Sequence, residues 1–322
     1  MTPGATTILL ERGVRPVHAG GLAAEAKPLP ARARWLATWQ VQLAICLVFA
    51  LILRAPSFGD PNLHVDETFY FLVGQEMHKG ALPYVDIWDR KPLGLFLIYY
   101  LIAGISHSVY AYQIVAWLFA ATTGFVVTRI AALWTAAQGA LLAGLAYLCL
   151  LLPLLGVGGQ APVFYNLPMA IAAWAIACSL ADLRRGSLRR RIYLAMALCG
   201  VAISIKQTAF AESVFFGAYT VALLWRARVP WPSLARFVLV ACALGAAPMF
   251  AIAVCYALGG HWSEFWQAMV LSNLRKQHAS WLQIEQSTLF VASNLALILA
   301  PAFLAIVLAR PSAPFAPYRR FL

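Results

Sequence analysis

Stretches of about 20 apolar residues recur along this chain, and each is long enough to cross a lipid bilayer as a helix. They give a composition in which 62% of the 322 residues are hydrophobic and 11% are charged. A soluble protein of this size needs more polar surface, so an ordinary globular enzyme is excluded. We therefore predict an all-α polytopic membrane protein. The candidate membrane segments are 36–54, 92–106, 109–133, 138–156, 163–182, 192–210, 211–226, 235–258 and 287–309.

The net charge of +12 does not indicate a nucleic-acid-binding protein. Such a protein carries its basic residues in one soluble patch, whereas here they form short clusters between apolar segments. Clusters of Lys and Arg mark cytoplasmic loops. They place the tail 1–35, the loops around 184–191 and 226–236, and the end after 309 in the cytoplasm. We expect the tail 1–35 to be disordered, and the chain to lie in a bacterial inner (plasma) membrane.

The charge pattern also indicates which segment fails to cross. After the first span the chain must return to the inside by Arg184, which takes an odd number of crossings, yet four candidates lie between. The weakest is 92–106, because its 15 residues form roughly 22 Å of helix against a core of about 30 Å. We predict that it enters the outer leaflet without crossing. About 8 transmembrane helices remain, with 17 of the 24 Lys and Arg residues inside and 9 of the 12 acids outside.

The first outer loop, 55–91, holds half of the acids of the chain. Within it, residues 65–79 have the spacing of an amphipathic helix that lies on the membrane surface, and Gly80 is expected to end that helix. The acid pair Asp66–Glu67 falls in the first turn, where acids complement the helix dipole. That structural role is sufficient to explain the pair if it is taken alone.

The cation pair Arg90–Lys91 closes the same loop, and such pairs commonly reach lipid headgroups without a further role. Acids and cations together on one short loop are suited to binding and reacting with a substrate. The cations can bind the phosphate of a lipid-linked substrate, and an acid can take the proton from an acceptor hydroxyl.

This loop resembles the first periplasmic loop of the GT-C membrane glycosyltransferases. The nearest branch uses polyprenyl- or dolichyl-phosphate sugars and includes the protein O-mannosyltransferases and the lipid A aminoarabinose transferases. The resemblance covers roughly 36–258, which is expected to form a GT-C-like core. The shared pattern is D-E-x-x-Y, a later Gly, P-Y-x-D and K-P, which stands here as Asp66, Glu67, Tyr70, Gly80, Pro83, Tyr84, Asp86, Lys91 and Pro92.

The resemblance implies that a sugar moves, with inversion, from a polyprenyl-phosphate donor to a lipid, glycan or protein acceptor on the periplasmic side. It implies that Asp66 is the general base and that Lys91, with Arg90 beside it, stabilises the leaving phosphate. Glu67 would orient Asp66, hold its charge state or contact the sugar, and the sequence leaves these three roles open. The further candidates for substrate binding are Tyr70, Tyr84, Asp86, Asp89 and Lys206.

We expect no cofactor and no metal. Many GT-C enzymes carry an acid in the second outer loop, where this chain has Asn166. The outer loop 259–286 has aromatic residues at helical spacing and predicts an interfacial helix. The segment 287–322 is expected to form the last span and a short cytoplasmic tail. Because the chain is short for the family, we expect a truncated or minimal member.

Two other functions stay open. A transporter or lipid flippase also carries charged residues near its spans, but it needs them near mid-bilayer, often in two related halves. Here the acids gather in one outer loop, and we find no internal repeat. An inactive or accessory GT-C homologue is the other alternative, and Asn166 together with the short C-terminal end motivates it.

A cysteine at position 134 tests the predicted topology. If 92–106 does not cross, Trp134 follows Arg129 on the cytoplasmic side. In a variant whose six native cysteines are replaced, Trp134→Cys should react with a membrane-impermeant thiol reagent only when the inner face is accessible. Reaction from the outside alone would contradict the topology.

Overall fold

The computed structural model describes residues 36–61, 65–154, 156–275 and 281–308, and within these ranges its regular elements are helices, with no strand. The predicted tail 1–35 and the end after 308 lie outside the described residues. The elements are α1 (Trp39–Arg54), η3 (Ala55–Ser57), α2 (Val65–His78), α3 (Leu93–Ala103), α4 (Val109–Ala131), α5 (Ala137–Leu151), α6 (Ala161–Ala177), α7 (Leu180–Arg184), α8 (Arg190–Ile205), α9 (Ala209–Arg226), α10 (Trp231–Leu258), α11 (Trp262–Trp266), η4 (Gln267–Leu271), α12 (Ser272–Leu274) and α13 (Trp281–Leu308).

Three of the described helices are long and apolar enough to span a membrane: α1 with η3, α4 and α10. Shorter apolar helices are α3, α5 and α6. This character indicates membrane association, whereas the count of about 8 spans stays a prediction. The apolar segments of the sequence coincide with helices to within a few residues. The exceptions are 163–182, which divides into α6 and α7, and 287–309, whose helix begins earlier, at Trp281.

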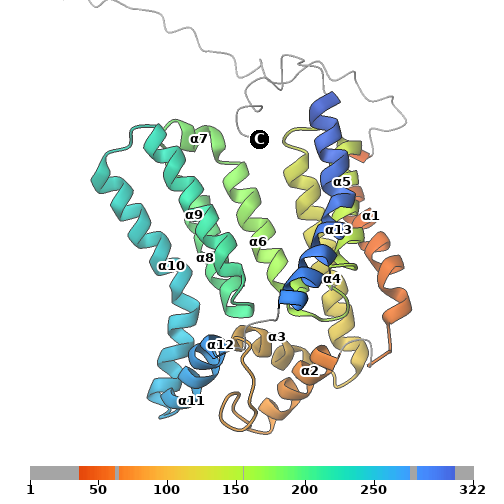
Figure 1. Ribbon diagram of the computed structural model, residues 1–322, viewed down its shortest axis with the longest axis vertical. Coiled ribbons are helices and arrows are strands. Elements are labelled where there is room, and N and C mark those ends of the chain that lie inside the picture. Colours follow the sequence, from red (N-terminus) through yellow and green to blue (C-terminus); the bar gives the residue numbers. More distant parts are fainter. Residues whose placement is uncertain (1–35, 62–64, 155, 276–280, 309–322) are drawn as a thin grey trace, which may run out of the picture.

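The helices pack around two clusters of buried side chains. The first cluster joins α1 to α5 with the N-terminal part of α6, the end of α10, α11 and η4. The second joins the rest of α6 with α8, α9 and α10. Figure 1 shows the corresponding two groups of long helices, with α6 between them. Helices α6 and α10 therefore contribute to both cores, and Ile205 at the end of α8 packs in the first.

Glycines set the closest helix contacts, as is usual for helices that pack within a membrane. A Cβ on Gly144 of α5 would overlap the side chain of Thr128 and the carbonyl oxygen of Gly124, both on α4. A Cβ on Gly200 of α8 would lie 2.6 Å from the carbonyl oxygen of Leu244 on α10. At both contacts the backbones approach each other more closely than any other residue type permits.

Helices α2 and α3 lie across one end of the bundle, at the bottom of Figure 1. The predicted end of α2 is confirmed, because Gly80 follows it with a φ of 99°. A Cβ on Gly74 of α2 would lie 2.6 Å from the carbonyl carbon of Tyr99, so α2 packs directly on the backbone of α3. Helix α3 has 11 residues, and its length of about 16 Å is too short to cross a bilayer.

The side of α2 that packs on the protein takes up part of the apolar stripe expected to face the membrane, because Val73 of that stripe is buried in the first core. The buried side chains include Glu67, Tyr70 and Phe71, whereas Val65 is 78% and Leu72 is 50% exposed. The helical period identifies a helix but does not say which of its faces meets protein and which meets lipid.

Within 259–286 the structure has the short helices α11, η4 and α12, up to Leu274, and their place at the membrane interface stays a prediction. Their aromatic residues divide between two environments. Trp262 and Trp266 are 47% and 41% exposed, while Phe265 is buried in the first core. The rest of that loop includes 276–280, which lie outside the described residues.

The α4–α5 contact predicts a difference between two Gly→Ala variants. Gly144→Ala places a methyl group against α4, and we expect it to destabilise the fold by about 1–3 kcal/mol. Gly217→Ala in α9 is the matched control, because nothing lies within 4 Å of its Cβ position. There the gain in helix propensity should be neutral or stabilising, by up to about 1 kcal/mol. Thermal unfolding in detergent measures both, and equal midpoints would contradict this packing.

Candidate functional site

The segment 156–159 connects α5 to α6 and is bound by side chains from three other helices. Arg54, the last residue of α1, is 5% exposed. Its guanidinium donates hydrogen bonds to the carbonyl oxygens of Gly156, at 3.2 Å, and of Gly158. The hydroxyl of Tyr99 on α3 donates to the carbonyl oxygen of Gly159 at 2.6 Å. The part of the first core near α2 and α3 is therefore assembled around a glycine backbone.

Glu67 on α2 binds the same segment through a backbone N–H group, whereas Arg54 and Tyr99 bind its carbonyl oxygens. Its side chain is fully buried, and its Oε2 accepts a hydrogen bond from the backbone N–H of Gly159. The second oxygen, Oε1, has no hydrogen-bond partner among the described residues. Burial raises the pKa of Glu67 to about 7, while the Gly159 hydrogen bond and the positive charge of Arg54 oppose that rise. Glu67 is thus poised to titrate near neutral pH.

Gly158 has to be a glycine for two reasons. Its φ of 50° lies in the left-handed region, and a Cβ there would overlap the carboxylate of Glu67. The close approach of backbone and carboxylate therefore depends on the missing side chain.

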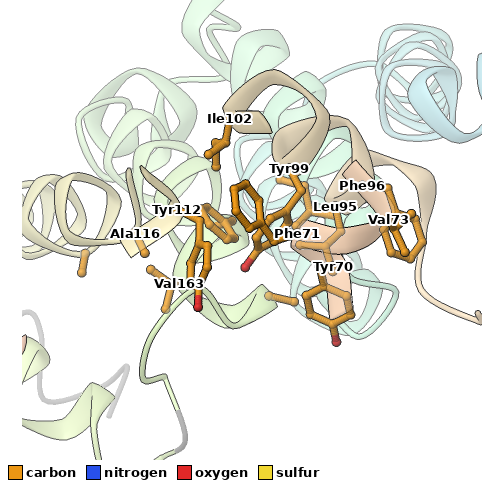
Figure 2. Close-up of a cluster of buried hydrophobic side chains, with 14 of the residues drawn as sticks. Tyr70, Phe71, Val73, Leu95, Phe96, Tyr99, Ile102, Tyr112, Ala116 and Val163 are labelled. Carbon is orange, nitrogen blue, oxygen red and sulfur yellow. The ribbon is translucent and has the colours of Figure 1, made fainter. Parts of the chain in front are cut away.

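Asp66, the neighbour of Glu67, lies in a different environment. It is half-buried and accepts a hydrogen bond of 3.2 Å from the hydroxyl of Tyr70. Burial and the negative charge of Asp66 raise the pKa of Tyr70 above its ordinary value, so its hydroxyl stays protonated and donates. In Figure 2 the Tyr70 hydroxyl points out of the aromatic cluster, on the same side as the hydroxyls of Tyr99 and Tyr112.

Lys91 approaches the same tyrosine from the other end of the loop. Its Nζ lies 5.9 Å from the centre of the Tyr70 ring, in a cation–π contact. Tyr70 therefore contacts both the predicted base and the predicted phosphate-binding cation. Of the residues named from the sequence, Asp66, Tyr70 and Lys91 are brought together in this way.

Lys206 joins this group because α3 and α8 meet closely. A Cβ on Gly94 would lie 2.7 Å from the carbonyl carbon of Ser204, at the end of α8. Lys91 precedes this contact on one chain segment and Lys206 follows it on the other. The Nζ of Lys206 lies 5.6 Å from the centre of the Tyr165 ring.

The two lysines influence each other electrostatically. Desolvation lowers the pKa of Lys206, the positive charge of Lys91 lowers it further, and the negative charge of Glu212 raises it. Neither lysine forms an ion pair with any residue that the structure describes. The result is a half-buried pair of cations whose charges no carboxylate of the described ranges neutralises directly.

The remaining predicted site residues shape the loop between α2 and α3. Asp86 is exposed, and its carboxylate accepts a hydrogen bond of 2.7 Å from the N–H of Leu82. Asp89 is half-buried and accepts one of 2.7 Å from the N–H of Lys91. Arg90 is exposed. Tyr84 is 4% exposed and donates its hydroxyl to the carbonyl oxygen of Lys91 at 2.7 Å, so its polar group is used within the protein.

Sequence reasoning missed Arg54, Tyr99 and Tyr165. Arg54 ends the first apolar run, where it looks like any flanking cation. The combination of a terminal arginine with the G-V-G-G sequence of the second outer loop is the only sequence signal for this contact, and it is weak. The two tyrosines lie inside apolar runs that predict core.

Comparison of the chain with protein-family models, with curated proteins and with solved structures gives no match.

The buried carboxylate predicts a pH dependence of stability. Because folding raises the pKa of Glu67 from 4.5 to about 7, the folded state binds its proton more tightly than the unfolded chain. The free energy of unfolding should fall by about 3 kcal/mol as pH rises from about 4.5 to 7 and then level off. Glu67→Gln cannot titrate and should lack this decline.

Thermal unfolding in detergent across this pH range measures the effect. Glu76→Gln is the control, since Glu76 lies on the same helix in a surface ion pair with Lys79 at 2.8 Å. It should keep the wild-type slope. An unchanged slope in Glu67→Gln would contradict the assignment.

Proposed function

We propose that this protein is a membrane glycosyltransferase that moves a sugar from a polyprenyl-phosphate donor to an acceptor hydroxyl on the outer side of the membrane, with inversion. The observation that carries the proposal is the group of Asp66, Tyr70, Lys91 and Lys206, which combines one carboxylate with two lysines that form no ion pair with the described part of the chain. The resemblance of the first outer loop to GT-C enzymes supports the same reading, and the bacterial inner membrane is the compartment that we propose.

The lysine pair supports a phosphate ligand on electrostatic grounds. Two like charges close together in a half-buried site repel each other, and this repulsion contributes to the lowered pKa of Lys206. A phosphate between them would replace repulsion by two attractive interactions, which are stronger in a poorly solvated site than in water. Lys91 and Lys206 would thereby bind the donor and stabilise the negative charge that develops on the leaving phosphate.

Asp66 is the proposed general base. As the acceptor hydroxyl attacks the anomeric carbon, its proton passes to a carboxylate oxygen of Asp66. A new bond forms between the acceptor oxygen and that carbon, and the bond from the carbon to the phosphate oxygen breaks with its electron pair leaving on the phosphate. Tyr70 donates to Asp66 and so orients the carboxylate without removing its capacity to accept a proton.

Glu67 has a different role in this proposal. Of the three roles that the sequence leaves open, full burial favours a positioning role over contact with the sugar. Glu67 anchors α2 to the segment 156–159 and thereby fixes the turn that carries Asp66. The same lysine pair would also suit a transporter or flippase for lipid phosphates, which needs no base, so the role of Asp66 separates the two functions.

A transfer assay in membranes with radiolabelled polyprenyl-phosphate sugars tests the proposal. Asp66→Asn should lower the transfer rate by about 10²–10⁴-fold, because the base is lost, while donor binding stays near the wild-type level. Lys91→Ala should weaken both donor binding and transfer. Glu76→Gln, which changes an acid of the same helix at the surface, should be close to wild type.

Two outcomes would contradict the proposal. Near-normal transfer by Asp66→Asn would show that Asp66 is not the base. Binding of polyprenyl phosphate without transfer from any donor would favour the transporter or the accessory homologue.

A further inference from the structure

The π-helical turn η4 lies between the two segments that carry the lysines. Its Met269 is 6% exposed, and its Sδ is 3.7 Å from the hydroxyl oxygen of Tyr84 and 3.7 Å from Nε2 of Gln207. The same Nε2 lies 3.4 Å from the carbonyl oxygen of Met269. One side chain, far from both lysines in the sequence, thus contacts the loop of Lys91 and the residue that follows Lys206.

Tyr84 is held in a backbone conformation that tyrosine rarely adopts, with a φ of 71°. Such a conformation costs of order 1–3 kcal/mol and persists only where surrounding contacts impose it. Here the hydroxyl of Tyr256 on α10 donates to the carbonyl oxygen of Pro83 at 2.9 Å. The ring of Tyr84 also packs on those of Tyr256 and Phe265, with centres 5.3 Å and 6.1 Å apart.

The same tyrosine donates its hydroxyl to the backbone of Lys91. The contacts therefore form a continuous path from Lys91 through Tyr84 and Met269 to Gln207, beside Lys206. The Gly94–Ser204 contact described above joins the two segments a second time. Two like charges must be kept near each other against their repulsion, and two separate tethers accomplish this.

We propose that Tyr84 and Met269 are positioning residues that set the separation of Lys91 and Lys206, with the π-helical turn serving as the spacer between them. The proposal rests on the proposed function only for the identity of the ligand, a phosphate. π-Helical turns are rare and occur frequently at functional sites, which agrees with this placement.

The pKa of Lys206 depends on its distance from Lys91, and this dependence can be measured without any substrate. The charged side chains that act on Lys206 are Lys91 and Glu212, and of these Lys91 lowers its pKa. If the contacts of Tyr84 and Met269 are lost, repulsion moves the two lysines apart and the pKa of Lys206 rises. A smaller fraction of its amine is then uncharged and reactive near neutral pH. The rate of amine modification at Lys206 therefore measures the separation.

The experiment follows modification of individual lysines by an amine-specific reagent across pH in the unliganded full-length protein, with mass spectrometry as the readout. Tyr84→Phe and Met269→Ala should each slow the modification of Lys206 at pH 8 by about threefold, because a higher pKa leaves less of the amine uncharged. Lys91→Gln, which removes the neighbouring charge, gives the upper limit of the effect.

Met169→Ala is the matched control. Met169 has the same exposed fraction, 6%, but it lies in the second core and contacts Ser213 instead of Tyr84. It should leave the modification of Lys206 unchanged. An unchanged Lys206 in both test variants, with thermal midpoints like that of Met169→Ala, would overturn the proposal. An equal change in all three variants would also overturn it, since it would show general loosening.

The result is independent of the proposed function because no donor takes part. If the two test variants slow the modification of Lys206 and the wild type transfers no sugar, the positioning role of Tyr84 and Met269 is supported and the transferase function is refuted. If the wild type transfers sugar and Lys206 has the same reactivity in every variant, the transferase function stands and the positioning role of Tyr84 and Met269 is refuted.

Discussion

The buried charges of Arg54 and Glu67 are the constraint on which the end of the bundle near α2 and α3 depends. The two side chains come from α1 and α2, and both bind the backbone of the segment 156–159. A buried charge is costly unless hydrogen bonds and an opposite charge compensate it. Here the Arg54 charge is compensated by two carbonyl oxygens and the Glu67 charge in part by a neighbouring N–H group, so the three chain segments have to meet at one place.

The two adjacent acids have different environments because of this constraint. Consecutive residues on an α-helix point about 100° apart, so a helix that buries Glu67 against its neighbours directs Asp66 elsewhere. One carboxylate holds the helix in place, and the other is left half-buried beside Tyr70. In the proposed reaction, the residue that supports the site and the residue that acts in it are covalent neighbours.

Much of this arrangement could be predicted from the sequence, because apolar runs report helices directly. The helix over 65–78 and its end at Gly80 follow from local patterns. The grouping of Asp66 and Lys91, which both contact Tyr70, is expected because the two residues share one short loop. The burial of Glu67 does not follow from such patterns, because helical periodicity does not show which face of a helix meets protein. The contacts of Tyr84 with Met269 join segments that lie far apart in the chain, and single residues of ordinary type carry no signal for such contacts.

Lys91 and Lys206 flank one close contact between two helices, and this arrangement has a mechanical consequence for the lysine pair. Lys91 leads into α3, whereas Lys206 follows Ile205, the last residue of α8, whose side chain packs in the first core. Any shift between α3 and the end of α8 changes the gap between the two ammonium groups. An anion bound in that gap would act as a cross-link between these two helices, and its release would free them to move. Occupancy of a single small site would thus restrict motion where α3 meets α8.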